Sequence, residues 1–177
     1  MMNKFNLACL VLLFTGLPAT NAADNLKFTG TIVASSCDVD TSSANQDVTI
    51  GQFSPADFPT VGTTTAAAKF NIKLKDCSEG ITGSKVLFSG TSDSSDPTLL
   101  ALSNTGKGTE GKMATGIGVQ ILDANQKAIS INNSDSDVYP LVEGTNNLDF
   151  YLRYKSTKTV VTAGDATAVM YFDMKYQ

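Results

Sequence analysis

The chain contains no histidine, and this absence removes several functional classes. Without histidine it cannot build a Ser-His-Asp triad, a Cys-His pair, or a zinc or copper site with an imidazole ligand. Runs of lysine and arginine are also missing, and the formal net charge of −4 argues against nucleic acid as a partner. We therefore expect no enzyme and no cofactor, and an enzymatic function ranks behind binding and structural alternatives.

Carboxylates are the remaining candidates for a metal site. Asp93 lies close to Asp96, and Asp135 lies close to Asp137, in segments rich in serine. A calcium-binding loop needs more oxygen ligands in a defined order. Solvated loop charge is therefore the simpler interpretation of both pairs, and no metal site is predicted.

Long apolar runs are missing beyond the first 22 residues. Lys4 precedes an apolar run at residues 7–14, and the small residues around Ala22 match a signal-peptidase site. Residues 1–22 are therefore predicted to be a signal peptide, because the run is too short to span a bilayer. Cys9 lies inside this run rather than after it, which argues against a lipoprotein.

Only two cysteines follow the predicted signal peptide, Cys37 and Cys77. In an exported chain this is the number required for one disulfide bond. No Cys-x-x-Cys motif accompanies them that would indicate redox or metal chemistry. We predict a structural disulfide between the two residues.

No amphipathic helix of useful length is present. Short alternating or apolar runs are separated by segments rich in Gly, Ser, Asn and Asp, which is typical of a β-sandwich or barrel. No linker divides these runs, so a single all-β domain is predicted. The expected strands cover residues 26–34, 47–53, 70–76, 85–89, 99–102, 116–123, 128–131, 147–155 and 167–176.

The final strand has a pronounced alternation. Its apolar row, Ala168, Met170, Phe172, Met174 and Tyr176, alternates with a second row that becomes polar toward the end. A period of two indicates a strand with one face in a core. Such a strand needs a neighbour, and the identity of that neighbour bears on function.

The start of the mature chain has the same pattern. Leu26, Phe28, Gly30 and Ile32 alternate with polar residues between positions 27 and 31. An ordinary first strand with Gly30 at a bulge is one interpretation. A strand intended for another molecule is the other.

Taken together, these segments resemble the pilin subunits of chaperone–usher fimbriae of the type 1 and P-pilus kind. In that family a glycine stands fourteenth from the C-terminus and a tyrosine is penultimate, as Gly164 and Tyr176 do here. The resemblance covers essentially the whole mature chain. It is also carried by residues 26–33 ahead of Cys37, residues 70–74 ahead of Cys77, residues 116–123, and Tyr154 after the run at Phe150.

The resemblance implies an incomplete immunoglobulin-like β-sandwich that is completed by a donor strand from another subunit. Residues 23–34 would be the N-terminal donor-strand extension, which runs into the first strand, and residues 35–177 would be the pilin domain. The donor face would consist of Leu26, Phe28, Gly30 and Ile32. The acceptor groove and chaperone-recognition site would consist of Gly164, Met170, Phe172, Met174, Tyr176 and Gln177.

The implied function is that of a structural subunit of an adhesive fimbria, exported through the periplasm to the cell surface. The implied partners are a periplasmic pilus chaperone, an outer-membrane usher and neighbouring pilin subunits, in a homo- or hetero-polymer. The short stretch 23–29 before Gly30 resembles a minor or tip-type subunit. The alternative is a stand-alone secreted β-sandwich binding module, which would complete its own sheet and be stable as a monomer.

Overall fold

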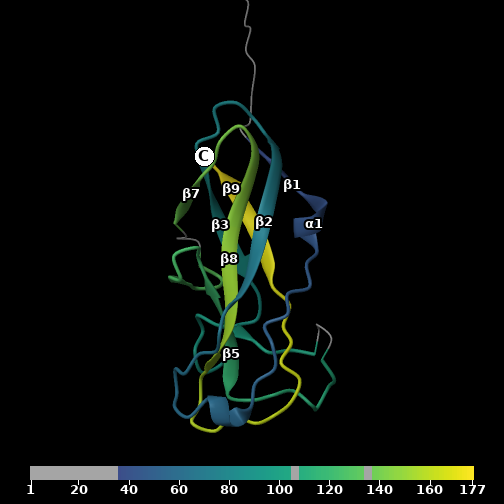
Figure 1. Cartoon of the computed structure of the whole chain (residues 1–177), viewed down its shortest axis with the longest axis vertical. Coiled ribbons are helices and arrows are strands. Elements are labelled where there is room, and N and C mark those ends of the chain that lie inside the picture. Colours follow the sequence, from purple (N-terminus) through teal and green to yellow (C-terminus); the bar gives the residue numbers. More distant parts are fainter. Residues whose placement is uncertain (1–35, 105–107, 134–136) are drawn as a thin grey trace, which may run out of the picture. The chain divides into compact units, whose positions relative to one another are not determined.

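Two antiparallel β-sheets face each other in the computed structural model, which describes residues 36–104, 108–133 and 137–177 (Figure 1). All of these residues belong to one compact unit. The strands are β1 (Asp38–Val39), β2 (Ala68–Cys77), β3 (Gly83–Ser89), β4 (Leu100–Ala101), β5 (Ile117–Leu122), β6 (Ala128–Ile129), β7 (Val138–Pro140), β8 (Gly144–Ser156) and β9 (Tyr171–Tyr176). A short helix, α1 (Thr41–Ala44), and a 3-10 turn, η1 (Pro55–Asp57), complete the described elements.

The first sheet has the order β1-β2-β8-β5-β4, with β6 paired to β5, and the second has the order β7-β3-β9. In Figure 1, β2 and β8 lie side by side in front, and β3 and β9 lie behind them. The described part of the chain contains no helix with the length and apolar character needed to cross a membrane.

The core lies between the two sheets and follows from the alternation of their strands. Phe70 of β2 is directly opposite Phe150 of β8, and their stacked rings have centroids 5.6 Å apart. Phe88 of β3 meets both rings edge-on, at 6.2 and 5.0 Å. These ring geometries are favourable for aromatic quadrupoles. Phe70, Phe88 and Phe150, which the alternation of their strands predicts to be buried, therefore join the two sheets.

The all-β prediction is confirmed, and most expected strands are present with small shifts at their ends. β1 and β7 were not expected, because two and three residues are too few to show a period. The segment 26–34 lies outside the described residues. β9 begins at Tyr171 rather than at residue 167, because its partner β3 ends at Ser89, directly opposite Tyr171.

The prediction of a strand at residues 47–53 is wrong. Val48 and Ile50 do pack against the core, as the alternation indicates. However, residues 48–53 form no backbone–backbone hydrogen bond with another described residue. The pattern therefore identifies the buried row correctly, but within the described part of the chain this segment has no ladder partner.

Candidate functional site

Strand β9 is buried less than its neighbour, although the two strands share one inward face. Among the residues that the structure describes, β9 is the last strand of its sheet and pairs only with β3. The inward β3 residues are at most 1% exposed, whereas their β9 partners are only partly buried. The directly opposed pairs are Ser84–Tyr176, Val86–Met174 and Phe88–Phe172. The inward face of the second sheet is therefore fully buried on β3 and only partly buried on β9.

Residues 48–53 approach the segment that contains β9 at one end, where residues 51–53 and residues 161–166 line a common pocket. At the other end of this segment, the Tyr176 hydroxyl donates a hydrogen bond of 2.9 Å to the carbonyl oxygen of Cys37. We call the inward-facing row of residues 48–53 together with the inward-facing row of residues 166–176 the open edge. Both of its sides carry partly buried apolar side chains that pack against the core.

The pocket at the end of the open edge has a volume of about 460 Å³, and its walls carry both polar and apolar groups, with the polar surface the larger share. Phe53, Phe58, Ile117 and Val161 contribute apolar surface. Tyr154 packs edge-on against Phe53 with ring centroids 6.0 Å apart, and its hydroxyl donates to the carbonyl oxygen of Ala166 at 2.6 Å. Burial raises the pKa of Tyr154.

Gly164 lies where two main chains touch. A Cβ atom at this position would lie well inside van der Waals distance of main-chain atoms of Lys112, Met113 and Ala114. The neighbouring Asp165 holds the two segments together. Its N–H donates to the carbonyl oxygen of Lys112 at 2.7 Å, and its own carbonyl oxygen accepts from the N–H of Ala114 at 2.9 Å.

The Asp165 carboxylate also accepts from the N–H of Thr109 at 2.7 Å. Asp165 thus fixes the loop at 109–114 against the wall of the pocket. Sequence reasoning missed both the loop and Asp165, because a contact between segments so far apart along the chain leaves no periodic signal. Sequence reasoning identified Gly164 only because a glycine occupies the same position, fourteenth from the C-terminus, in the family that the sequence resembles.

The expected disulfide joins Cys37 to Cys77, across 40 residues of sequence, and both residues are buried. The Asn146 amide donates to the Cys77 sulfur at 3.2 Å. Burial raises the pKa of the Tyr176 phenol. The disulfide therefore anchors the acceptor atom to which Tyr176 is bonded.

The remaining predicted site residues fall into two groups. Met170 lies in the same partly buried row as Phe172, whereas Gln177 is exposed and its main chain binds the start of β3. Its N–H donates to the carbonyl oxygen of Gly83 at 2.8 Å, and its main-chain oxygen accepts from the N–H of Thr82 at 3.1 Å. The predicted donor residues Leu26, Phe28, Gly30 and Ile32 lie outside the described residues.

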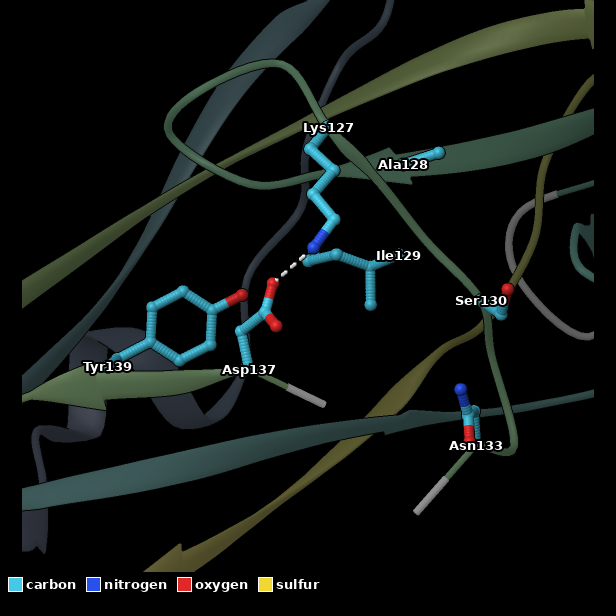
Figure 2. A pocket seen from close by; sticks show the side chains of 7 residues that line it. All are labelled: Lys127, Ala128, Ile129, Ser130, Asn133, Asp137 and Tyr139. Atoms are coloured by element: carbon cyan, nitrogen blue, oxygen red, sulfur yellow. Dashed lines mark hydrogen bonds and ion pairs between the residues drawn. The ribbon is translucent and has the colours of Figure 1, made fainter. Parts of the chain in front are cut away.

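A second, smaller pocket of about 190 Å³ lies beside β6 and β7 (Figure 2). The Lys127 ammonium points at the Asp137 carboxylate and pairs with it at 2.7 Å. Burial, followed by the nearby carboxylates of Asp123 and Asp137, raises the pKa of Tyr139 to about 12. The charges of Lys127 and Asp137 in this pocket are thus paired, and the Tyr139 phenol is protonated at neutral pH. This pocket offers neither a general base nor an unpaired charge for a ligand.

Of the acidic pairs singled out in the sequence, Asp93 and Asp96 serve local structure, whereas Asp135 lies outside the described residues. Asp93 accepts from the N–H groups of Ser95 and Asp96 at 2.8 and 3.1 Å. The Thr98 hydroxyl and then the Lys155 ammonium, both hydrogen-bonded to Asp96, lower the pKa of the Asp96 carboxyl. Among the described residues, no group of three or more acidic, Cys or His side chains could hold a metal ion.

The same two-sheet fold is found in solved structures of pilus subunits. The P pilus rod subunit PapA has the same fold, with a TM-score of 0.66 and 24% identity, over 80% of this chain and 99% of that chain. The model of the fimbrial protein family matches residues 26–177. The chain therefore belongs to the fimbrial protein family.

Two relatives support this membership. The uncharacterized fimbrial-like protein YcbU of Escherichia coli is 49% identical over 84% of this chain and 81% of its own length. The fimbrial subunit type 1 of Salmonella typhimurium is 40% identical over 90% of this chain and 86% of its own length. The protein is a structural subunit of a cell-surface fimbria, with the immunoglobulin-like β-sandwich of pilins.

Proposed function

We propose that this pilin joins its neighbours by donor-strand complementation and exchange, with the open edge as acceptor and residues 23–34 as donor. The observation that carries this proposal is the difference in burial between β3 and β9. The row Phe172, Met174 and Tyr176 remains partly exposed while its β3 partners are fully buried. A further strand laid along β9 would cover this row. Pilin assembly is a known case of such strand addition.

The donor residues suit this task. Burial of Leu26, Phe28 and Ile32 would contribute about 1.5–3 kcal/mol each. The three together, about 5–9 kcal/mol, are comparable to the stability of a whole domain. Gly30 would allow close approach of the two backbones, and the polar residues between the donor positions would face solvent.

Before assembly, the same edge would be covered by a periplasmic chaperone, since an uncovered edge strand is a template for aggregation. Residues 1–22 would direct export to the periplasm. The C-terminal residues Tyr176 and Gln177 would be the recognition point for the chaperone, and an outer-membrane usher would then exchange the chaperone for the next subunit. The short stretch 23–29 supports a minor or tip-type rank.

The test uses a synthetic peptide of residues 24–34 and a chain that begins at residue 34. At a peptide concentration of about 100 times its Kd, binding to the folded state alone adds about 2.7 kcal/mol. This corresponds to a rise in Tm of roughly 5–11 °C for a domain of this size. Differential scanning fluorimetry across a peptide titration measures the rise.

The matched control is the same peptide with Phe28→Asp, which places a charge in the donor face. We expect no rise in Tm with this peptide. A stand-alone binding module would be stable without either peptide and unaffected by both. If the native peptide raised neither Tm nor solubility, donor-strand assembly by this segment would be abandoned.

A further inference from the structure

The place where the N-terminal extension enters the domain is held by three kinds of bond. Ser36, the first described residue, donates its N–H to the Ser78 hydroxyl at 3.0 Å and accepts at its carbonyl oxygen from the N–H of Ser78 at 3.0 Å. The next residue, Cys37, forms the disulfide with Cys77. The Tyr176 hydroxyl then binds the carbonyl oxygen of Cys37 at 2.9 Å. We call Ser36, Cys37, Cys77, Ser78 and Tyr176 the extension root.

The disulfide decides which residues carry a pull on the extension. A force applied before Cys37 reaches this residue first and crosses the covalent bond to Cys77. Residues 38–76 lie inside the closed loop, because the bond spans 40 residues. This loop contains β1, α1, most of β2 and residues 48–53 of the open edge. With the disulfide intact, none of them lies on the path of the force.

Without the disulfide, the force would pass along a weak path. β1 has only two residues, which pair with Lys75 and Leu74 of β2. The following residues 45–67, all described, contain no strand. Under tension this part of the chain would separate from the domain one residue at a time, because each hydrogen bond would bear the force alone. The disulfide removes this part of the chain from the load.

Beyond Cys77, the path to β9 is short. Only a few residues after Cys77, the N–H of Thr82 donates to the main-chain oxygen of Gln177, and the N–H of Gln177 donates to the carbonyl oxygen of Gly83. The bond from Tyr176 to Cys37 is a second, parallel connection to the same end of β9. Both routes lead from the extension root to the strand that borders the open edge.

We propose that the extension root is a load-bearing junction between the outgoing and the incoming strand of each subunit. It rests on the donor-strand proposal, since residues 23–34 must be the outgoing strand and β9 must hold the incoming one. The disulfide and the Tyr176 hydroxyl transfer axial tension from a subunit's own extension to the strand that binds the next subunit. Tyr176 is a positioning residue in this junction, because it acts through Cys37.

Single-molecule stretching of fibres assembled from the mature chain tests the junction. Fibres are pulled before and after addition of a phosphine reductant, so that every subunit has folded with its disulfide. After reduction, each unfolding event should release about 130–145 Å more length, since 40 residues at roughly 3.3–3.6 Å each join the loaded chain. The mean unfolding force should fall. Unchanged lengths and forces would overturn the proposal.

Tyr176→Phe removes only the hydroxyl, and Tyr171→Phe is its matched control, on the opposite face of the same strand and 67% exposed. In oxidised fibres we expect Tyr176→Phe to lower the unfolding force without changing the released length, and Tyr171→Phe to change neither. After reduction the difference between the two variants should shrink, because only the hydrogen bonds between Ser36 and Ser78 then hold the chain beside the Cys37 carbonyl. Equal forces for both variants in oxidised fibres would contradict the role of Tyr176.

A deletion of residues 24–34 separates this proposal from the one on which it rests. If fibres form without these residues, the donor-strand proposal fails, and the load-bearing proposal fails with it. If fibres require them and reduction changes neither force nor length, only the load-bearing proposal fails. If fibres dissolve in reductant without load, the disulfide serves folding alone, which also overturns it.

Discussion

The main-chain contact at Gly164 gives a quantitative prediction for the substitution Gly164→Ala. The added methyl group would overlap main-chain atoms of Lys112, Met113 and Ala114, none of which can rotate away. The two segments must therefore separate. Their separation stretches the hydrogen bonds from Asp165 to Lys112 and from Ala114 to Asp165, which are 2.7 and 2.9 Å long.

Two opposing effects set the magnitude. Overpacking of this kind costs about 1–3 kcal/mol, and each weakened hydrogen bond adds about 0.5–1.5 kcal/mol. Replacing glycine by alanine also restricts the unfolded chain, which returns about 0.4–1 kcal/mol. Overlap with the main chain outweighs this gain. We expect Gly164→Ala to lower the free energy of unfolding by about 2–4 kcal/mol.

Urea unfolding of the purified mature protein, followed by far-UV circular dichroism, measures the loss. Gly108→Ala is the matched control in the same region. Its added methyl would meet the Met113 sulfur, which lies near the end of a flexible side chain, and the Thr167 hydroxyl, which donates to the carbonyl oxygen of Ser103 at 2.8 Å. The control should lose less than Gly164→Ala, because one side-chain hydrogen bond of about 0.5–1.5 kcal/mol is at stake and no main chain must move. Equal unfolding midpoints for Gly164→Ala and the unaltered protein would refute the packing role of Gly164.

Two further predictions concern charge. The pKa of Tyr139 is raised from 10.0 to about 12, chiefly by burial, so the unfolded state loses this proton first as the pH rises. The contribution of this shift to the free energy of unfolding is fully present below pH 10 and is lost between pH 10 and about 12. Solvent screening reduces this contribution to about 1–2 kcal/mol. Tyr139→Phe should therefore flatten the decline of urea midpoints over this range, and an unchanged decline would contradict the assignment. On the outer face of the second sheet, Lys85 lies directly opposite Lys175. Lys175→Glu should raise the free energy of unfolding by about 0.2–1 kcal/mol at low salt and by much less at 1 M salt, where the charges are screened; a gain that persists at 1 M salt would show another cause.

Strands with a regular alternation could be predicted from the sequence. In β2, the row Phe70, Ile72 and Leu74 is buried as its period indicates, because one face of this strand meets the core along its whole length. Residues 48–53 show the limit of this reasoning. Their pattern predicts which side chains turn inward, but a strand also needs a hydrogen-bonded partner, and periodicity carries no information about partners.

The pocket and its supporting loop could not be predicted. Gly164 and Asp165 meet residues 109–114 only because the sandwich brings these segments together. Neither segment has a regular period, and the contact is made by main-chain atoms, which are the same in every sequence. A glycine without a positive φ gives no turn signal either. Only the fold shows that the missing side chain at Gly164 is a steric requirement.

The two edges of the second sheet differ in how well they are protected against pairing with a further strand. β7 has three residues and ends in Pro140, which cannot donate a ladder hydrogen bond, so this edge resists pairing. β9 has six residues and no proline, and its charged residues Asp173 and Lys175 lie on the outer face. Natural sheets shield the edges that must remain unpaired. Only β7 is shielded in this way, and β9, the unshielded edge, is also the strand whose inward row is incompletely buried. The burial deficit and the missing protection thus coincide on β9, and this coincidence supports the proposal that another subunit adds a strand there.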